Sequence, residues 1–128
     1  MPRPPGPSRA ETPPETESQL LQAALSSVQE LLPRGWSQAL RVEPPDRGPY
    51  RPDAMIELQP PTSESITFVV EVKRTISPRE LPYVLMQLRS YIASEPGRGM
   101  LPMVVARYLP PSTRKQLIEE HIAFADAT

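Results

Sequence analysis

Two carboxylates and a lysine stand near the middle of the chain, in the stretch RPDAMIELQPPTSESITFVVEVKR, residues 51–74. Asp53 opens one apolar run, and Glu71 and Lys73 close a second one. Side chains of a β-strand alternate between its two faces, so Glu71 and Lys73 share a face. If the two runs pair as a hairpin that turns near residues 60–65, Asp53 lies close to both. The pattern then places two carboxylates and an ammonium group at one edge of a sheet.

Such a cluster is suited to a divalent cation. Two carboxylates in a partly buried place repel each other, which raises the pKa of at least one, and a cation removes that conflict. Mg²⁺ favours one or two carboxylates together with waters and phosphate oxygens. A neighbouring lysine can lower the pKa of an attacking water or steady negative charge that develops on a phosphate. The residues therefore predict metal-assisted hydrolysis of phosphodiester bonds.

The flanking sequence predicts the elements that would hold these residues. Apolar residues at helical spacing predict a first helix over 18–32, with one apolar face made of Leu21, Ala24, Leu25, Val28, Leu31 and Leu32. Ser77, with Pro78 and Glu80 after it, has the form of a capping box and predicts a second helix from there to about Ala93. The remaining predicted elements are strands at 36–43, 53–59, 66–74, 100–109 and 122–127 and a helix from Pro110 to about Glu120.

These elements predict an α/β fold with a mixed central sheet flanked by helices. The early strands are joined by short turns and are expected to be antiparallel, whereas the later strand-helix-strand units predict parallel crossovers. The strand over 66–74 is apolar on both faces, which is typical of a central strand covered on both sides. The length of 128 residues fits one domain. Residues 1–17 are predicted to be a disordered proline-rich tail, and residues 18–128 the folded domain.

Composition excludes several kinds of site. The chain has no cysteine, so it has no disulfide, thiolate zinc site or cysteine nucleophile, and this suits a cytoplasmic protein. One histidine rules out a histidine-rich metal site and leaves oxygen ligands, hence Mg²⁺, Mn²⁺ or Ca²⁺. No run is long enough for a membrane span, and no secretory signal is expected. The formal net charge of −1 argues against tight, unaided binding to nucleic acid.

The motif residues resemble those of a known superfamily. Pro52-Asp53, followed after seventeen residues by Glu71-Val72-Lys73, resembles the PD-(D/E)xK signature of the restriction-endonuclease-like nucleases. The predicted order of elements over about 18–126 is similar to that superfamily's αβββαβ core. The segment Gln87-Leu88-Arg89-Ser90-Tyr91 is similar to the QxxxY element of the branch that includes the nuclease domains of bacterial recombination helicase-nucleases.

The resemblance implies a role for each matching residue. Asp53, Glu71 and the carbonyl of Val72 would hold Mg²⁺ or Mn²⁺, and Lys73 would be the catalytic lysine. Gln87 and Tyr91 would support the site or contact the substrate, which would be DNA. Many members also carry a glutamate in the first helix, for which Glu30 is the candidate here.

Other interpretations stay open. Glu71 and Lys73 could be solvated residues at a strand end, Asp53 a turn cap, and Gln87 and Tyr91 ordinary residues at a helix edge. The same fold could be a catalytically silent module for regulation, assembly or protein interaction. An unrelated α/β interaction protein is a third hypothesis, and it requires that the strands do not pair as inferred. A homodimer, a partner protein or a larger complex would each suit a small nuclease domain.

Overall fold

The computed structural model describes residues 16–42, 44, 49–95 and 99–127. Its elements follow one another as α1 (Glu17–Leu31), β1 (Ser37–Arg41), β2 (Ala54–Gln59), β3 (Ile66–Thr75), α2 (Leu81–Ala93), β4 (Met100–Tyr108), α3 (Pro111–Glu119) and β5 (Ala123–Asp126). The order αβββαβαβ is the predicted one. Residues 1–15 of the predicted tail and parts of the predicted loops at 44–50 and 95–99 lie outside the described residues.

The five strands form one mixed sheet in the order β1-β2-β3-β4-β5. The pairs β1–β2 and β2–β3 are antiparallel, while β3–β4 and β4–β5 are parallel. The parallel pairs are those joined through a helix, because a parallel connection needs a crossover. The predicted mixed α/β sheet and the central place of the strand over 66–74 are both confirmed.

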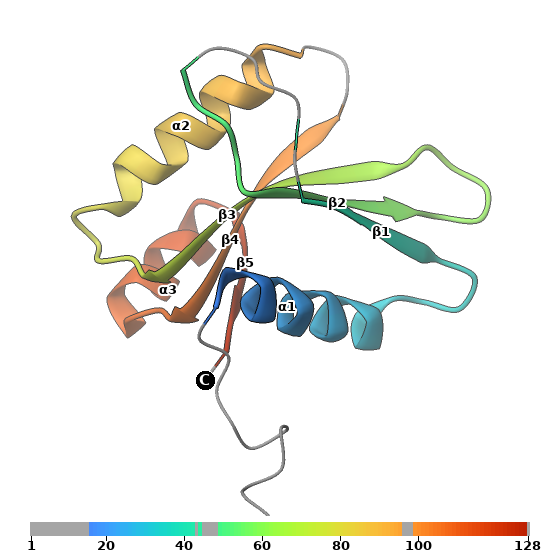
Figure 1. The fold of residues 1–128 in the computed structure, drawn as a ribbon, viewed down its shortest axis with the longest axis horizontal. Coiled ribbons are helices and arrows are strands. Elements are labelled where there is room, and N and C mark those ends of the chain that lie inside the picture. The colour runs from blue at the N-terminus through green and yellow to red at the C-terminus, as the bar shows by residue number, and fades with distance from the viewer. Residues whose placement is uncertain (1–15, 43, 45–48, 96–98, 128) are drawn as a thin grey trace, which may run out of the picture.

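Helices cover both faces of the sheet (Figure 1). On one face α1 packs against side chains of β2, β3 and β4 that include Ile56, Val70 and Val105. On the other face α2 and α3 pack against Val69 and Val104. All five of these side chains are 0–1% exposed, and fully burying one of them contributes about 1.5–3 kcal/mol to folding. Because β3 is packed on both faces, it is a rigid support for Glu71 and Lys73.

The first helix begins with a complete capping box. The Thr16 side chain accepts a hydrogen bond from the Gln19 N–H, and the Gln19 side chain accepts one from the Thr16 N–H, both at 3.1 Å. The folded domain therefore includes Thr16 and Glu17, whereas the sequence predicts a tail that extends to residue 17. Leu31, predicted to lie on the apolar face of this helix, is 84% exposed in its last turn. Leu20, left out of the predicted face, is buried.

The second helix begins later than its capping signal predicts. The Ser77 hydroxyl accepts a hydrogen bond from the Glu80 N–H at 3.2 Å and donates one to the Glu80 carboxylate at 3.0 Å. The residues between them form a turn, and α2 starts at Leu81. Pro82 has no N–H, so it cannot donate to the carbonyl of Pro78 four residues earlier. That missing bond explains why a regular helix does not extend back to Pro78.

None of the helices in the described ranges is long and apolar enough to span a bilayer.

Candidate active site

The antiparallel pairing of β2 and β3 brings the predicted carboxylates together. Ala54 pairs with Val70, and the residue before it, Asp53, donates its N–H to the Val70 carbonyl at 3.0 Å. The Asp53 Oδ2 atom in turn accepts a hydrogen bond from the Val72 N–H at 2.7 Å. Asp53 therefore lies beside the Glu71–Val72 peptide, as the hairpin interpretation predicts. This pairing contradicts the hypothesis of an unrelated α/β protein, which required the strands to stay apart.

Glu71 is a buried acid, with only 6% of its surface exposed. Its pKa is raised from the ordinary 4.5 to about 8, first by burial, and then by hydrogen bonding with Asp53 and by the charge of Asp53. The positive charge of Lys73 and a hydrogen bond from Tyr50 oppose this rise in pKa. The cluster thus has the conflict between neighbouring carboxylates that a cation would relieve.

Lys73 lies on the same side of β3 as Glu71. Its Nζ atom is 3.9 Å from Glu71 Oε2, and its side chain is 46% exposed while that of Glu71 is 8% exposed. The ammonium group is therefore much more accessible to solvent than the carboxylate beside it.

Tyr50 is a member of the site that the sequence did not reveal. Its hydroxyl donates a hydrogen bond to Glu71 Oε1 at 3.1 Å. Its ring packs edge-to-face on the ring of Tyr91, with centroids 6.4 Å apart and planes at 81°. Burial, followed by the charge of Glu71, raises the pKa of Tyr50, which keeps the hydroxyl protonated. Tyr50 follows a proline-rich stretch with no periodic pattern, so only its position three residues before Asp53 could have drawn attention to it.

The glutamate of the first helix that approaches the site is Glu17, and the candidate Glu30 is wrong. Burial, followed by the charge of Asp53 and hydrogen bonding with it, raises the pKa of Glu17. Glu30 is exposed near the other end of α1, about 20 Å away at 1.5 Å per residue. An acidic residue in the first turn of a helix is also favoured by the helix dipole, which supplies a purely local reason for Glu17.

Tyr91 and Gln87 lie differently in α2. Tyr91 is 2% exposed and belongs to the core, so it contacts the site from inside, through Tyr50. Gln87 is half-buried and donates a hydrogen bond to the Tyr83 hydroxyl at 3.2 Å, one turn earlier in the helix. Tyr91 is thus placed to support the site through Tyr50, whereas the role of Gln87 stays a prediction.

The donor set fits a cation that takes few protein ligands. Within the described part of the chain, no group of three or more His, Cys, Asp or Glu side chains is placed to hold a metal ion. Glu17 therefore acts on Asp53 through its charge and hydrogen bonding, without completing a closed three-acid site. Mg²⁺ needs only one or two carboxylates, because waters and substrate phosphates complete its octahedron. Asp53 and Glu71 meet that requirement.

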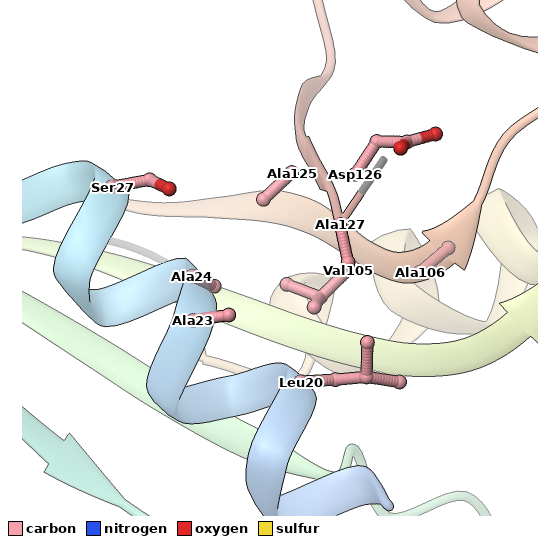
Figure 2. Close-up of a pocket in the computed structure, with 9 residues that line it drawn as sticks. All are labelled: Leu20, Ala23, Ala24, Ser27, Val105, Ala106, Ala125, Asp126 and Ala127. Atoms are coloured by element: carbon pink, nitrogen blue, oxygen red, sulfur yellow. The ribbon is translucent and has the colours of Figure 1, made fainter. Parts of the chain in front are cut away.

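A hollow on the α1 face of the sheet shares no lining residue with this cluster. It lies between α1 and the strands β4 and β5 and has a volume of about 200 Å³ (Figure 2). Small and apolar side chains line most of it: Leu20, Ala23, Ala24, Ser27, Val105, Ala106, Ala125 and Ala127, together with Asp126. The Asp126 carboxylate points away from α1 and accepts a hydrogen bond from the Leu109 N–H. The hollow thus brings no second set of reactive groups together.

The fold is similar to that of a solved nuclease. The crystal structure of a repair endonuclease from Pyrococcus abyssi superimposes with a TM-score of 0.53 and 18% identity, over 89% of this chain and 47% of that one. This chain therefore spans just under half the length of that protein. No protein-family model and no curated protein matches the sequence. The likeness is one of fold, and it defines the domain as a nuclease-like α/β fold.

Proposed function

We propose that the chain is a metal-dependent nuclease of the PD-(D/E)xK type that hydrolyses phosphodiester bonds of DNA. The observation that carries this proposal is the pairing of β2 with β3, which sets Asp53 against the Glu71–Val72 peptide and leaves Lys73 beside Glu71. The nuclease-like fold supports it, since the similar solved structure is that of a repair endonuclease.

Asp53, Glu71 and the Val72 carbonyl would hold Mg²⁺ or Mn²⁺. In a strand, the N–H and C=O groups of one residue point toward the same neighbouring strand. The Val72 N–H points toward Asp53, so the Val72 carbonyl faces the same side, just beyond the start of β2. When bound, the cation supplies Lewis-acid stabilisation of the negative charge that develops on the phosphate.

The protein groups have separate tasks. The Val72 N–H orients the Asp53 carboxylate, and Tyr50 does the same for Glu71. Lys73 reaches solvent from beside Glu71 and would stabilise negative charge on the phosphate or on the attacking water. Because the pKa of Glu71 is raised to about 8, this acid carries a proton at neutral pH that a cation must displace. Metal affinity should therefore increase with pH.

The proposal is tested by cleavage of labelled linear, nicked and single-stranded DNA with Mg²⁺ or Mn²⁺. We expect cutting by the wild type that EDTA abolishes and that falls at least about 100-fold in Glu71→Gln and in Lys73→Ala, since each removes charge from the reacting centre. Glu64→Ala is the matched control, because Glu64 is exposed in the turn at the far end of the β2–β3 hairpin. The products distinguish endonuclease from exonuclease action.

No cutting by the wild type, on any of these substrates and with either metal, would contradict the proposal. The interpretation would then move to a catalytically silent module of the same fold. Cleavage that survives in both Glu71→Gln and Lys73→Ala would assign the activity to other residues.

A further inference from the structure

We propose that Tyr50 is a positioning residue for the Glu71 carboxylate, and that Tyr91 of α2 holds Tyr50 in place. The inference rests on the proposed metal centre and deepens it. It gives the tyrosine of the QxxxY-like segment an indirect role, through a second tyrosine, in place of contact with the substrate.

The first step is the separation of the two oxygens of Glu71. Oε1 accepts the hydrogen bond from the Tyr50 hydroxyl at 3.1 Å, and Oε2 faces the Lys73 ammonium at 3.9 Å. A carboxylate with a different partner on each oxygen has a defined plane, whereas without Tyr50 the orientation of Glu71 would depend on the flexible lysine and on Asp53. Tyr50 is the more rigid of the two partners, because its ring packs against the core of the α2 face.

The second step is the support of the Tyr50 ring itself. Tyr50 precedes β2, so the sheet ladder does not fix its ring. The edge-to-face contact with Tyr91, at 6.4 Å and 81°, is the geometry that aromatic pairs prefer. Tyr91 is 2% exposed among buried side chains of α2 such as Leu88. The fixed position of α2 thus restrains Glu71 through the Tyr91 ring, the Tyr50 ring and the Tyr50 hydroxyl.

The burial of Tyr91 also decides against direct contact with a substrate. A side chain that is 2% exposed presents almost no surface to a nucleic acid. Its ring nevertheless contacts Tyr50, and Tyr50 in turn donates a hydrogen bond to Glu71, a proposed metal ligand. Partners of this kind, which orient a metal-binding side chain without touching the metal, change metal affinity by about 10- to 100-fold when they are replaced.

The test measures Mn²⁺ affinity by electron paramagnetic resonance, alongside the thermal unfolding midpoint, on the full chain. Tyr50→Phe keeps the ring and removes the hydroxyl, so we expect affinity to fall about tenfold with little change in the midpoint. Tyr83→Phe is the matched control: it also removes one tyrosine hydroxyl, from an exposed residue that accepts a hydrogen bond from Gln87. It should leave Mn²⁺ affinity unchanged.

A second pair of variants tests the ring contact. Tyr91→Leu should weaken Mn²⁺ binding, and the double variant with Tyr50→Phe should lose little more than Tyr50→Phe alone, because both act on Glu71 by one route. Leu88→Val, a buried change in the same helix, should lower the unfolding midpoint without weakening Mn²⁺ binding. This variant therefore distinguishes a general loss of stability from a loss of the Glu71 orientation.

The outcomes distinguish the inference from the proposed function. If the wild type binds Mn²⁺ and Glu71→Gln does not, but Tyr50→Phe binds like the wild type, the positioning role is overturned and the metal centre stands. If the wild type binds no Mn²⁺, or Glu71→Gln binds as well as the wild type, the metal centre at Glu71 fails and the positioning role fails with it. Equal weakening by Tyr83→Phe and Tyr50→Phe would also overturn the inference.

Discussion

At the scale of single residues, the ionisation of Glu71 links the site to the stability of the fold. Its pKa is about 8 in the folded chain against an ordinary 4.5. A raised folded pKa means that the stabilising contribution is complete below pH 4.5 and is lost as pH rises toward 8. For the metal-free protein, we expect the free energy of unfolding to fall by up to about 1.4 kcal/mol per pH unit over that window from this group.

Urea unfolding in EDTA at pH 5.5, 6.5, 7.5 and 8.5 measures this effect against Glu71→Gln. The amide cannot ionise, so the difference in unfolding free energy between variant and wild type should grow in favour of the variant with pH and level off above about 8. Saturating Mg²⁺ should remove most of the trend, because the cation takes the place of the proton. A difference that stays constant with pH would show that Glu71 ionises normally.

The same residues show what sequence alone can locate. The convergence of Asp53, Glu71 and Lys73 could be predicted because it depends on local features alone. Side chains alternate between the two faces of a strand, and two strands joined by a short turn pair as a hairpin. Tyr50 and Glu17 reach the cluster from a loop and from a helix N-terminus on the α1 side. Their positions depend on how α1 and the segment before β2 pack on the sheet, and no local pattern encodes that packing.

At the scale of elements, one hydrogen bond ties α3 to the segment between β3 and α2. The Thr113 hydroxyl, 0% exposed in the first turn of α3, donates to the Ile76 carbonyl at 2.7 Å. Thr113→Val keeps the shape and leaves that buried carbonyl without its donor, so we expect a loss of about 1–3 kcal/mol in unfolding free energy. Ser112→Ala, at the exposed neighbouring position, is the control and should stay within about 0.5 kcal/mol of the wild type in urea unfolding. Equal stability of Thr113→Val and wild type would show that the bond contributes nothing.

The elements themselves were largely predictable, with two exceptions. The order, the mixed sheet and the central β3 followed from periodicity and from the lengths of the connections. The start of α2 did not, because Pro82 removes the donor that would have bonded to Pro78. The exposure of Leu31 was also missed, since a helical wheel assigns a face but does not say where the sheet beneath it ends.

At the scale of the whole molecule, the small net charge limits how the proposed nuclease could bind DNA. A formal charge of −1 provides no general attraction to phosphates. The exposed cations closest in sequence to the site are Lys73 itself, Arg74, Arg51 and Arg79. Binding should therefore depend on the divalent cation and on a few local contacts, and it should be much weaker in EDTA.

The salt dependence of binding measures those contacts. In Ca²⁺, an oxygen-liganded cation used here in place of Mg²⁺, we expect log K against log salt to fall with a slope no steeper than about −4, because each of these four cations neutralises at most one phosphate and each neutralised phosphate contributes about 0.9. Arg74→Ala should reduce the slope by about 1. Arg34→Ala should not, because Arg34 is exposed in the turn after α1, away from the β3 end. Fluorescence anisotropy of a labelled duplex across a salt series gives both slopes. A steep slope that Arg74→Ala leaves unchanged would place the phosphate contacts on another surface, and the cluster around Glu71 would then need a different substrate.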